Sequence, residues 1–152
     1  MKVSDILRVK GSTLYTATPD EPLSHALDLM AERDIGSLVV MEQGKLVGML
    51  TFREVIKRIV SNGGALGATS VRNAMDSAPL TCTPETDMDD VRRMMLERHA
   101  RYMPVMDEKM LMGVISFYDV AKAVVDSQNF ENQMLKAYIR DWPGQDEEEK
   151  AT

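Results

Sequence analysis

The chain has 152 residues, of which 44% are apolar and 28% are charged, so it is long enough for one domain or for two small ones that share a core. Its net charge of −6 argues against nucleic acid or an anionic membrane as the main partner, because both repel an acidic surface. The single cysteine, Cys82, excludes an intrachain disulfide and a cysteine metal cluster, and no apolar stretch is long enough to span a membrane. These features predict a cytoplasmic protein in which Cys82 is a small buried residue.

The first part of the chain, residues 1–62, predicts one β-α-β-β-α unit. Apolar residues recur at helical spacing after Pro19, and two short apolar runs precede Thr51. The expected elements are a strand at Leu14–Thr18, a helix with Leu23, Ala26, Leu27 and Met30 on its apolar face, strands at Leu38–Met41 and Leu46–Leu50, and a helix that starts at Thr51.

The second part of the chain, residues 71–126, repeats the first. A shift of 65 residues superposes the two parts without a gap, so that Gly48-Met49-Leu50-Thr51 falls on Gly113-Val114-Ile115-Ser116. The expected elements are a strand at Leu80–Thr83, a helix with Met88, Val91, Met94 and Met95 on its apolar face, strands at Met103–Met106 and Leu111–Ile115, and a helix that starts at Ser116. A shorter similarity, between Val3–Leu7 and Val71–Met75, precedes the two copies.

Neither copy is expected to fold alone, because a unit of about 60 residues buries only about 60% of its surface. The two copies are therefore predicted to pack about a pseudo-twofold axis, which gives an α+β fold. The glycine-rich segment 63–70 is the expected linker. After the second copy, the sequence predicts a separate C-terminal helix at 127–141 and an acidic flexible tail at 142–152.

Two Thr/Ser-x-x-Glu/Asp patterns stand at equivalent places in the copies: Thr51 with Glu54, and Ser116 with Asp119. The common interpretation is a capping box, in which hydroxyl and acid satisfy the first backbone N–H groups of a helix. The alternative is a ligand site, because a helix N-terminus favours phosphate and an acid there can accept hydrogen bonds from ribose hydroxyls. A glycine three residues before each pattern favours the ligand site, because its missing side chain lets a molecule approach the backbone.

A Gly-apolar-apolar-Thr/Ser-x-x-acid sequence that closes a β-α-β-β-α unit, used twice, resembles the cystathionine β-synthase (CBS) domain pair, or Bateman module. The resemblance covers roughly residues 1–125, and Arg101-Tyr102-Met103-Pro104-Val105 also resembles that family's entry to a strand. It implies clefts between the two repeats that bind AMP, ADP, ATP, NAD or S-adenosylmethionine, with AMP expected first. In such pairs the adenine lies among apolar strand residues, while Thr/Ser, acidic and basic residues hold ribose and phosphate.

The resemblance implies two sets of nucleotide-binding residues. The first set comprises Thr51, Arg53 and Glu54, with Ile35, Gly36, Ser37 and Val39 at the strand entry. The second set comprises Ser116 and Asp119, with Ala100, Arg101, Tyr102 and Pro104, and Tyr118 takes the place of Arg53. Thr16, Thr18, Thr81 and Thr83 stand where backbone contacts to the base are expected.

The two sites are expected to be unequal, because the sequence departs from the family pattern. Glu54 replaces the usual Asp and adds a methylene, and Gly36 stands where the second copy has Arg101. The site with Asp119 is therefore expected to bind better than the site with Glu54. Arg53 and Arg101 either contact phosphate or are solvated surface charges.

Three classes of function follow from these features. The leading hypothesis is a non-catalytic regulatory module that pairs into a disc-like homodimer, binds an adenine nucleotide and signals to a partner protein in trans. The alternative is a ligand-independent dimeric scaffold, which Glu54 and Gly36 favour. An enzyme is the third class, but one cysteine, two histidines far apart and no metal-ligand spacing supply no set of nucleophile, base and oxyanion site.

Overall fold

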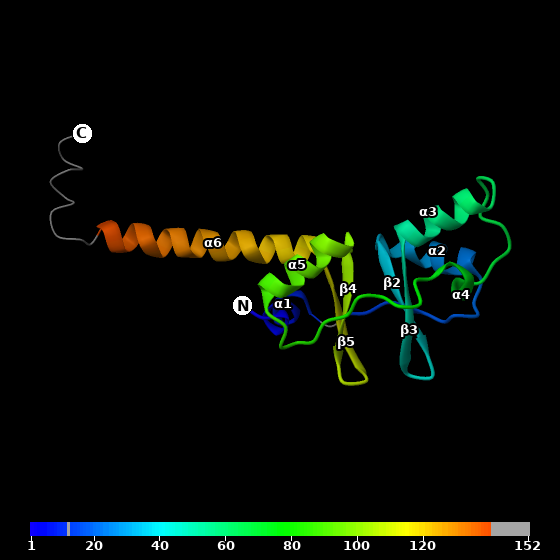
Figure 1. The fold of residues 1–152 in the computed structure, drawn as a ribbon, viewed down its shortest axis with the longest axis horizontal. Coiled ribbons are helices and arrows are strands. Elements are labelled where there is room, and N and C mark those ends of the chain that lie inside the picture. Colours follow the sequence, from blue (N-terminus) through cyan, green and yellow to red (C-terminus); the bar gives the residue numbers. More distant parts are fainter. Residues whose placement is uncertain (12, 141–152) are drawn as a thin grey trace.

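The computed structural model describes residues 1–11 and 13–140, and the predicted acidic tail lies outside them. Two halves stand side by side, and each contains a β-hairpin with helices packed against it (Figure 1). In chain order the elements are α1 (Val3–Lys10), β1 (Thr16–Ala17), α2 (Leu23–Arg33), β2 (Ser37–Glu42), β3 (Lys45–Thr51), α3 (Phe52–Ser61), α4 (Val71–Ala74), α5 (Met88–Arg98), β4 (Tyr102–Asp107), β5 (Met110–Ser116) and α6 (Phe117–Arg140). The fold is α+β with two repeats and a C-terminal helix, as the sequence predicts.

The strands of the two halves are equivalent except at one place. The first half holds a three-stranded sheet in the order β1-β2-β3, in which β1 runs parallel to β2 and β2 runs antiparallel to β3. In the second half β4 and β5 form the matching hairpin, but the strand predicted at Leu80–Thr83 is reduced to one parallel bridge between Cys82 and Val105. Pro79 and Pro84 flank this bridge and have no N–H to extend a ladder.

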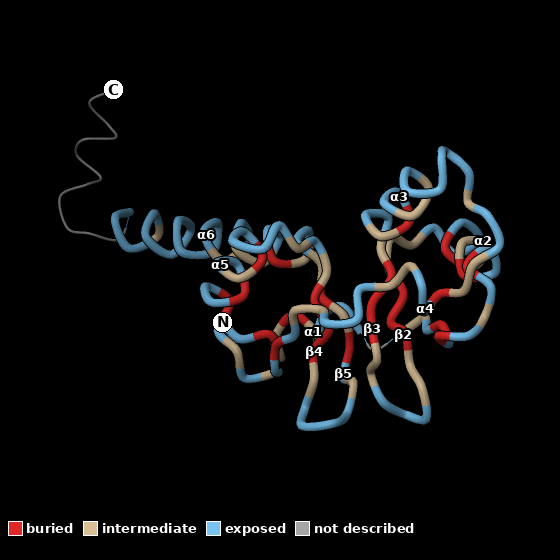
Figure 2. The backbone as a smooth tube through the Cα atoms, turned by 45° about the vertical axis from the view of Figure 1, so that its right-hand side comes forward, coloured by how far each residue is buried: buried red, intermediate tan, exposed pale blue. Residues whose placement is uncertain are grey.

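Each half has its own apolar core. Each core also contains the helix that leads, along the chain, into the repeat of the other half. Val3 and Ile6 of α1 are buried in the second half, in the same cluster as Met95 and Ile115. Val71 of α4 is buried in the core of the first half. The buried segments of both hairpins mark these two cores in Figure 2. The halves thus exchange their leading helices, so each packing unit contains residues that lie outside its own sequence repeat.

Backbone hydrogen bonds repeat this exchange on both sides. The N–H of Val3 donates to the carbonyl of Thr86, and the N–H of Val71 donates to the carbonyl of Glu21, both at 3.0 Å. In the first half, Nη2 of Arg72 in α4 also lies 2.9 Å from Oε2 of Glu42 in β2. These contacts join the two repeats at two places besides the linker.

The C-terminal helix differs from the sequence prediction, because α6 is one continuous element where a separate helix at 127–141 was expected. Its 24 residues include no glycine or proline, so nothing interrupts it. The first turns pack on α1 and α5, and beyond Ser127 the helix extends away from the second half with nearly every side chain exposed (Figures 1 and 2). Among the described residues, no helix is both long and apolar enough to cross a bilayer.

Candidate functional site

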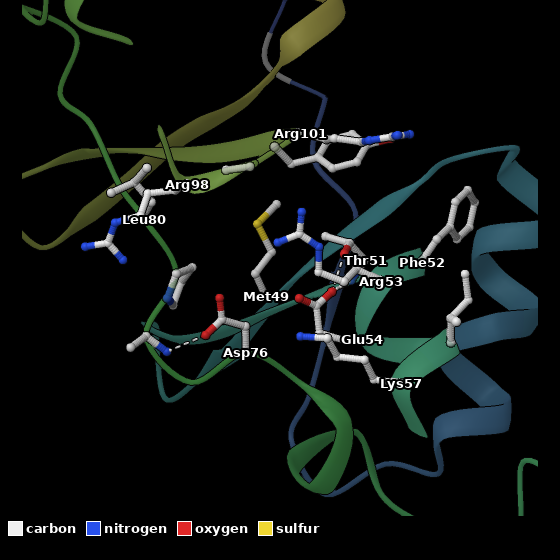
Figure 3. A pocket seen from close by; sticks show the side chains of 15 residues that line it. Met49, Thr51, Phe52, Arg53, Glu54, Lys57, Asp76, Leu80, Arg98 and Arg101 are labelled. Carbon is white, nitrogen blue, oxygen red and sulfur yellow. Dashed lines mark hydrogen bonds between the residues drawn. The ribbon is translucent and has the colours of Figure 1, made fainter. Parts of the chain in front are cut away.

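A cleft of about 670 Å³ lies where the first turn of α3, from the first half, faces the start of β4, from the second (Figure 3). This is the Thr51 cleft. It is lined by Met49, Thr51, Phe52, Arg53, Glu54, Ile56, Lys57, Asp76, Ala78, Pro79, Leu80, Arg98, Ala100, Arg101 and Tyr102. Both repeats and the segment that leads into the second repeat therefore meet in one cavity.

A second cleft, of about 860 Å³, lies where the first turn of α6 faces the start of β2. This is the Ser116 cleft. It is lined by Lys10, Thr13, Leu14, Tyr15, Ile35, Gly36, Ser37, Val39, Arg101, Tyr102, Val114, Ser116, Phe117, Tyr118 and Ala121. The 65-residue shift carries Thr51 onto Ser116 and Phe52 onto Phe117, so the two clefts are versions of one site.

The structure corrects the predicted grouping of the site residues. Each helix start was expected beside the strand entry of its own copy. Instead, Thr51 and Glu54 share a cleft with Arg101 of the other copy, whereas Ser116 shares a cleft with Gly36 and its neighbours as well as with Arg101 and Tyr102 of its own copy. The pseudo-twofold packing causes this crossing, because it sets the start of each helix beside the strand entry of the other half.

Both Thr/Ser-x-x-acid patterns form a capping box. The N–H of Thr51 donates to Oε2 of Glu54 at 2.9 Å, and the Thr51 hydroxyl bonds to the same oxygen. The N–H of Ser116 donates to Oδ2 of Asp119 at 2.8 Å, and the N–H of Asp119 donates to Oγ of Ser116 at 3.1 Å. The capping interpretation is confirmed for both patterns. Of the two acids, Glu54 also lines a cleft and Asp119 does not.

The glycines before the capping boxes make room for the chain itself rather than for a ligand. A Cβ at Gly48 would lie 2.8 Å from the carbonyl oxygen of Asp76 and 2.6 Å from Sδ of Met75. A Cβ at Gly113 would lie 2.8 Å from Cδ2 of Leu7. The missing side chains therefore admit the segments that lead into each repeat, and packing explains the signal that favoured a ligand at the sequence level.

Positive charge gathers at the Thr51 cleft. Its basic lining residues are Arg53, Lys57, Arg98 and Arg101. Glu54 and Asp76 are its acidic lining residues, so the lining carries an excess of positive charge. The guanidinium of Arg53 also donates to the carbonyl of His99, which connects α3 to the second half. Figure 3 shows Arg53 and Glu54 projecting from the start of α3 and Arg98 standing across the cleft from them.

Gly36 accommodates a side chain of the other repeat. A Cβ at Gly36 would clash with the hydroxyl oxygen of Tyr102, so Tyr102 packs over this position and lines both clefts. Arg101, beside it, also lines both clefts. The close approach of the two halves therefore explains why position 36 is glycine where the second copy has Arg101. The Thr51 cleft still has a cation, because Arg101 lines it.

Several predicted site residues lie outside the two clefts. Thr16 lines a third, more open cleft of about 810 Å³ near the turns of the two hairpins. Thr18, Thr81, Thr83 and Pro104 line none of these three clefts. The clefts are lined instead by the segments 13–15 and 78–80, which lie three residues nearer the N-terminus than the predicted threonines.

Asp119 is held in an ion pair. Its Oδ2 lies 2.6 Å from Nζ of Lys10, the last residue of α1. Burial raises the pKa of Asp119, but the hydrogen bonds from Lys10 and Ser116 outweigh it, so the pKa lies below its ordinary value of 3.8. The carboxylate is charged at neutral pH and already has a cationic partner.

Sequence reasoning missed several lining residues, notably Lys10, Met49, Asp76, Leu80 and Arg98. The internal repeat offered one signal. Met49 and Val114 stand two residues before Thr51 and Ser116, and they are equivalent positions in the two copies. Lys10 and Asp76 gave no such signal. They belong to the exchanged leading segments, and the exchange is visible only in three dimensions.

Comparison with known proteins identifies the family. The chain matches the CBS domain family over residues 3–61 and over residues 71–126. The CBS domain-containing protein CBSX3, mitochondrial, of Arabidopsis thaliana is 31% identical over 147 residues, which cover 91% of this chain and 71% of that protein.

Solved structures agree with this assignment. A CBS-domain protein from Burkholderia ambifaria MC40-6 has a TM-score of 0.78 and 31% identity, covering 84% of this chain and 96% of that one. CBSX2, solved in complex with AMP, shares the fold with a TM-score of 0.67 and 24% identity, covering 84% of this chain and 98% of that one. One family match falls on each sequence repeat, so the chain belongs to the CBS domain family and carries two CBS domains in tandem.

Proposed function

We propose that the Thr51 cleft binds an adenine nucleotide and that the chain is a regulatory module. AMP is the first candidate, and ATP, NAD(H) and S-adenosylmethionine are the others. The observation that carries the proposal is the set of four basic residues beside the N-terminus of α3: Arg53, Lys57, Arg98 and Arg101. Arginine forms strong charge-assisted hydrogen bonds to phosphate, and a helix N-terminus favours the same group.

The remaining lining residues of the Thr51 cleft fit a nucleoside. Met49, Leu80 and Tyr102 offer apolar surface for a purine ring. The carboxylate of Glu54 has lone pairs left after its bonds to Thr51, so it is the proposed acceptor for ribose hydroxyls. CBSX2, which has the same fold, was solved with AMP, and this supports an adenine nucleotide as the ligand class.

The module is proposed to be non-catalytic. Cys82, the one cysteine of the chain, is buried, and burial raises the pKa of its thiol to about 12. The thiol is therefore protonated at neutral pH and is a poor nucleophile. Regulation would instead come from a nucleotide that binds one arrangement of the two halves better than another, and so changes how a partner protein is bound.

The proposed assembly is a homodimer formed through α3 and the start of α6. Phe52, Ile56 and Val60 form an exposed apolar stripe on α3 at helical spacing, with 56%, 59% and 71% of their surface exposed. The 65-residue shift carries this stripe onto α6, where Phe117 and Val125 are its exposed ends. Both helices lie on the same side of the molecule in Figures 1 and 2. A twofold dimer would cover this patch with its own copy.

Calorimetric titration with AMP tests the proposed nucleotide site. Arg98→Ala is expected to weaken AMP binding about tenfold or more, because a hydrogen bond to a charged group contributes about 1.5–3 kcal/mol. The affinity for adenosine, which has no phosphate, is expected to stay the same. Arg93→Ala is the matched control on the same helix, where Arg93 pairs with Asp90 at 3.1 Å on the surface, and it should leave AMP affinity unchanged.

Two results would contradict the proposal. If AMP, ATP, NADH and S-adenosylmethionine all fail to bind below millimolar concentrations, the nucleotide function is wrong, and a scaffold that binds its partner without ligand becomes the better account. If Arg93→Ala and Arg98→Ala weaken AMP binding equally, the effect is one of net charge, and Arg98 does not contact the phosphate.

A further inference from the structure

The Ser116 cleft contains a contact that the Thr51 cleft lacks. Lys10, at the C-terminal end of α1, lines the cleft and reaches Oδ2 of Asp119 at 2.6 Å. The same ammonium donates to the carbonyl oxygen of Val114 at 2.9 Å. The Lys10 side chain is 39% exposed, whereas that of Asp119 is 17% exposed. Of this ion pair, Lys10 lines the cleft and Asp119 does not.

The equivalent position in the other half is different. The leading segments align with a shift of 68 residues over Val3–Leu7 and Val71–Met75, but α1 continues to Lys10 whereas α4 ends at Ala74. Ala78 lines the Thr51 cleft, but its methyl group cannot pair with an acid. Among the described residues, no ion pair is recorded for Glu54, which faces the cleft. The two clefts thus differ in whether their capping acid is open to a ligand.

We propose that Lys10 closes the Ser116 cleft to nucleotides, because its ammonium takes the carboxylate that a ribose would need, so that the chain binds one nucleotide, in the Thr51 cleft. This inference rests on the proposed function, since it specifies which of two equivalent clefts the nucleotide enters. It reverses the sequence-level expectation that the Asp119 site binds better.

The relative strengths of the competing hydrogen bonds explain why Lys10, rather than a ribose hydroxyl, bonds to Asp119. A ribose hydroxyl is a neutral donor, and charge-assisted hydrogen bonds are roughly twice as strong as neutral ones. A ribose that displaced Lys10 would also leave the ammonium and the carbonyl of Val114 without their present partners. The Ser116 N–H donates to the same oxygen of Asp119 at 2.8 Å, so a backbone donor and the ammonium together hold this oxygen in place.

The binding stoichiometry of AMP tests the inference. Lys10→Met removes the ammonium and keeps most of the aliphatic side chain. In equilibrium dialysis with labelled AMP, the wild-type chain is expected to bind one AMP and the Lys10→Met chain two. Lys45→Met, at an exposed position in the first hairpin, is the matched control and is expected to bind one. Carbon-detected NMR titration of the Asp119 carboxyl reports the pair itself, and its pKa should rise when Lys10 is replaced.

The outcomes separate this inference from the proposed function. Two AMP molecules on the wild-type chain would overturn the role of Lys10 and leave the nucleotide function standing. One AMP on both chains, with the Asp119 pKa raised in Lys10→Met, would also overturn it, because the pair would be broken without opening the cleft. No AMP on the wild type and one on Lys10→Met would support Lys10 as the closing residue and contradict the Thr51 cleft. No AMP on either chain would overturn both.

Discussion

The two glycines that precede the capping boxes are explained by the atoms that pack against them. Gly48 and Gly113 are equivalent in the repeat, yet the atoms that face them differ in freedom. At Gly48 one near atom is the carbonyl oxygen of Asp76, whose backbone bridges β3. At Gly113 the near atom is Cδ2 of Leu7, the end of a flexible side chain. A backbone atom held by hydrogen bonds cannot give way as a leucine methyl can.

This difference predicts unequal effects of the same substitution. Gly48→Ala is expected to destabilise the fold by about 1–3 kcal/mol, the range for overpacking a filled site. Gly113→Ala should cost clearly less, because Leu7 can change its rotamer. Urea denaturation of the two variants measures both, and the midpoint of Gly48→Ala should be the lower one. Equal midpoints would show that both contacts adjust equally well to an added methyl group, which would contradict the expected difference.

At the scale of single elements, the capping boxes and hairpins could be predicted from the sequence, because their signals are local. Thr51 and Glu54 stand three residues apart and bond to each other, so no distant information was needed. The break expected before Ser127 was not present, because α6 contains nothing that stops a helix. The strand expected at Leu80–Thr83 is reduced to a single bridge, because Pro79 and Pro84 on either side have no N–H to extend the ladder.

The exchange of leading helices makes a prediction for α1. Val3 is fully buried in the core of the second half although it is the third residue of the chain. Val3→Ala is expected to cost about 2 kcal/mol, in line with large-to-small core substitutions. Val9→Ala on the same helix is the control, because Val9 is 87% exposed and should change stability little. Thermal or urea unfolding compares the two variants.

Hydrogen exchange locates the effect. In Val3→Ala, the amides of β4 and β5 are expected to lose more protection than those of β2 and β3, since α1 packs with the second half. Greater loss in the first hairpin would mean that α1 stabilises its own repeat, which would contradict the exchanged packing.

At the scale of the whole molecule, the sequence predicted the two repeats and their pseudo-twofold packing but not which residues meet across it. Fifteen residues line the Thr51 cleft, and they come from the end of β3, α3, the 76–80 segment, the end of α5 and the start of β4. A linear comparison of the copies finds Thr51 and Ser116, but it does not place Arg101 beside Thr51 or Gly36 beside Ser116. The crossing follows from the arrangement of the halves in space, which no local pattern records.

The proposed homodimer is also testable at this scale. Ile56→Asp places a charge in the middle of the exposed stripe on α3, and burying that charge without a partner is unfavourable. The wild-type chain is expected to elute as a dimer in size-exclusion chromatography with light scattering, and Ile56→Asp as a monomer. Val9→Asp, an equally drastic change at an exposed position of α1, should remain a dimer. A wild-type chain that is monomeric at every concentration measured, or a dimer that persists in Ile56→Asp, would refute this interface.

We propose that the two equivalent clefts of this CBS pair differ in function and that the nucleotide binds in only one of them. The most direct measurement is a crystal structure of the chain grown with AMP. We expect AMP in the Thr51 cleft, with its phosphate at the basic side chains and its ribose at Glu54, while Lys10 remains paired with Asp119 in the other cleft. AMP in the Ser116 cleft, with Lys10 displaced, would contradict it.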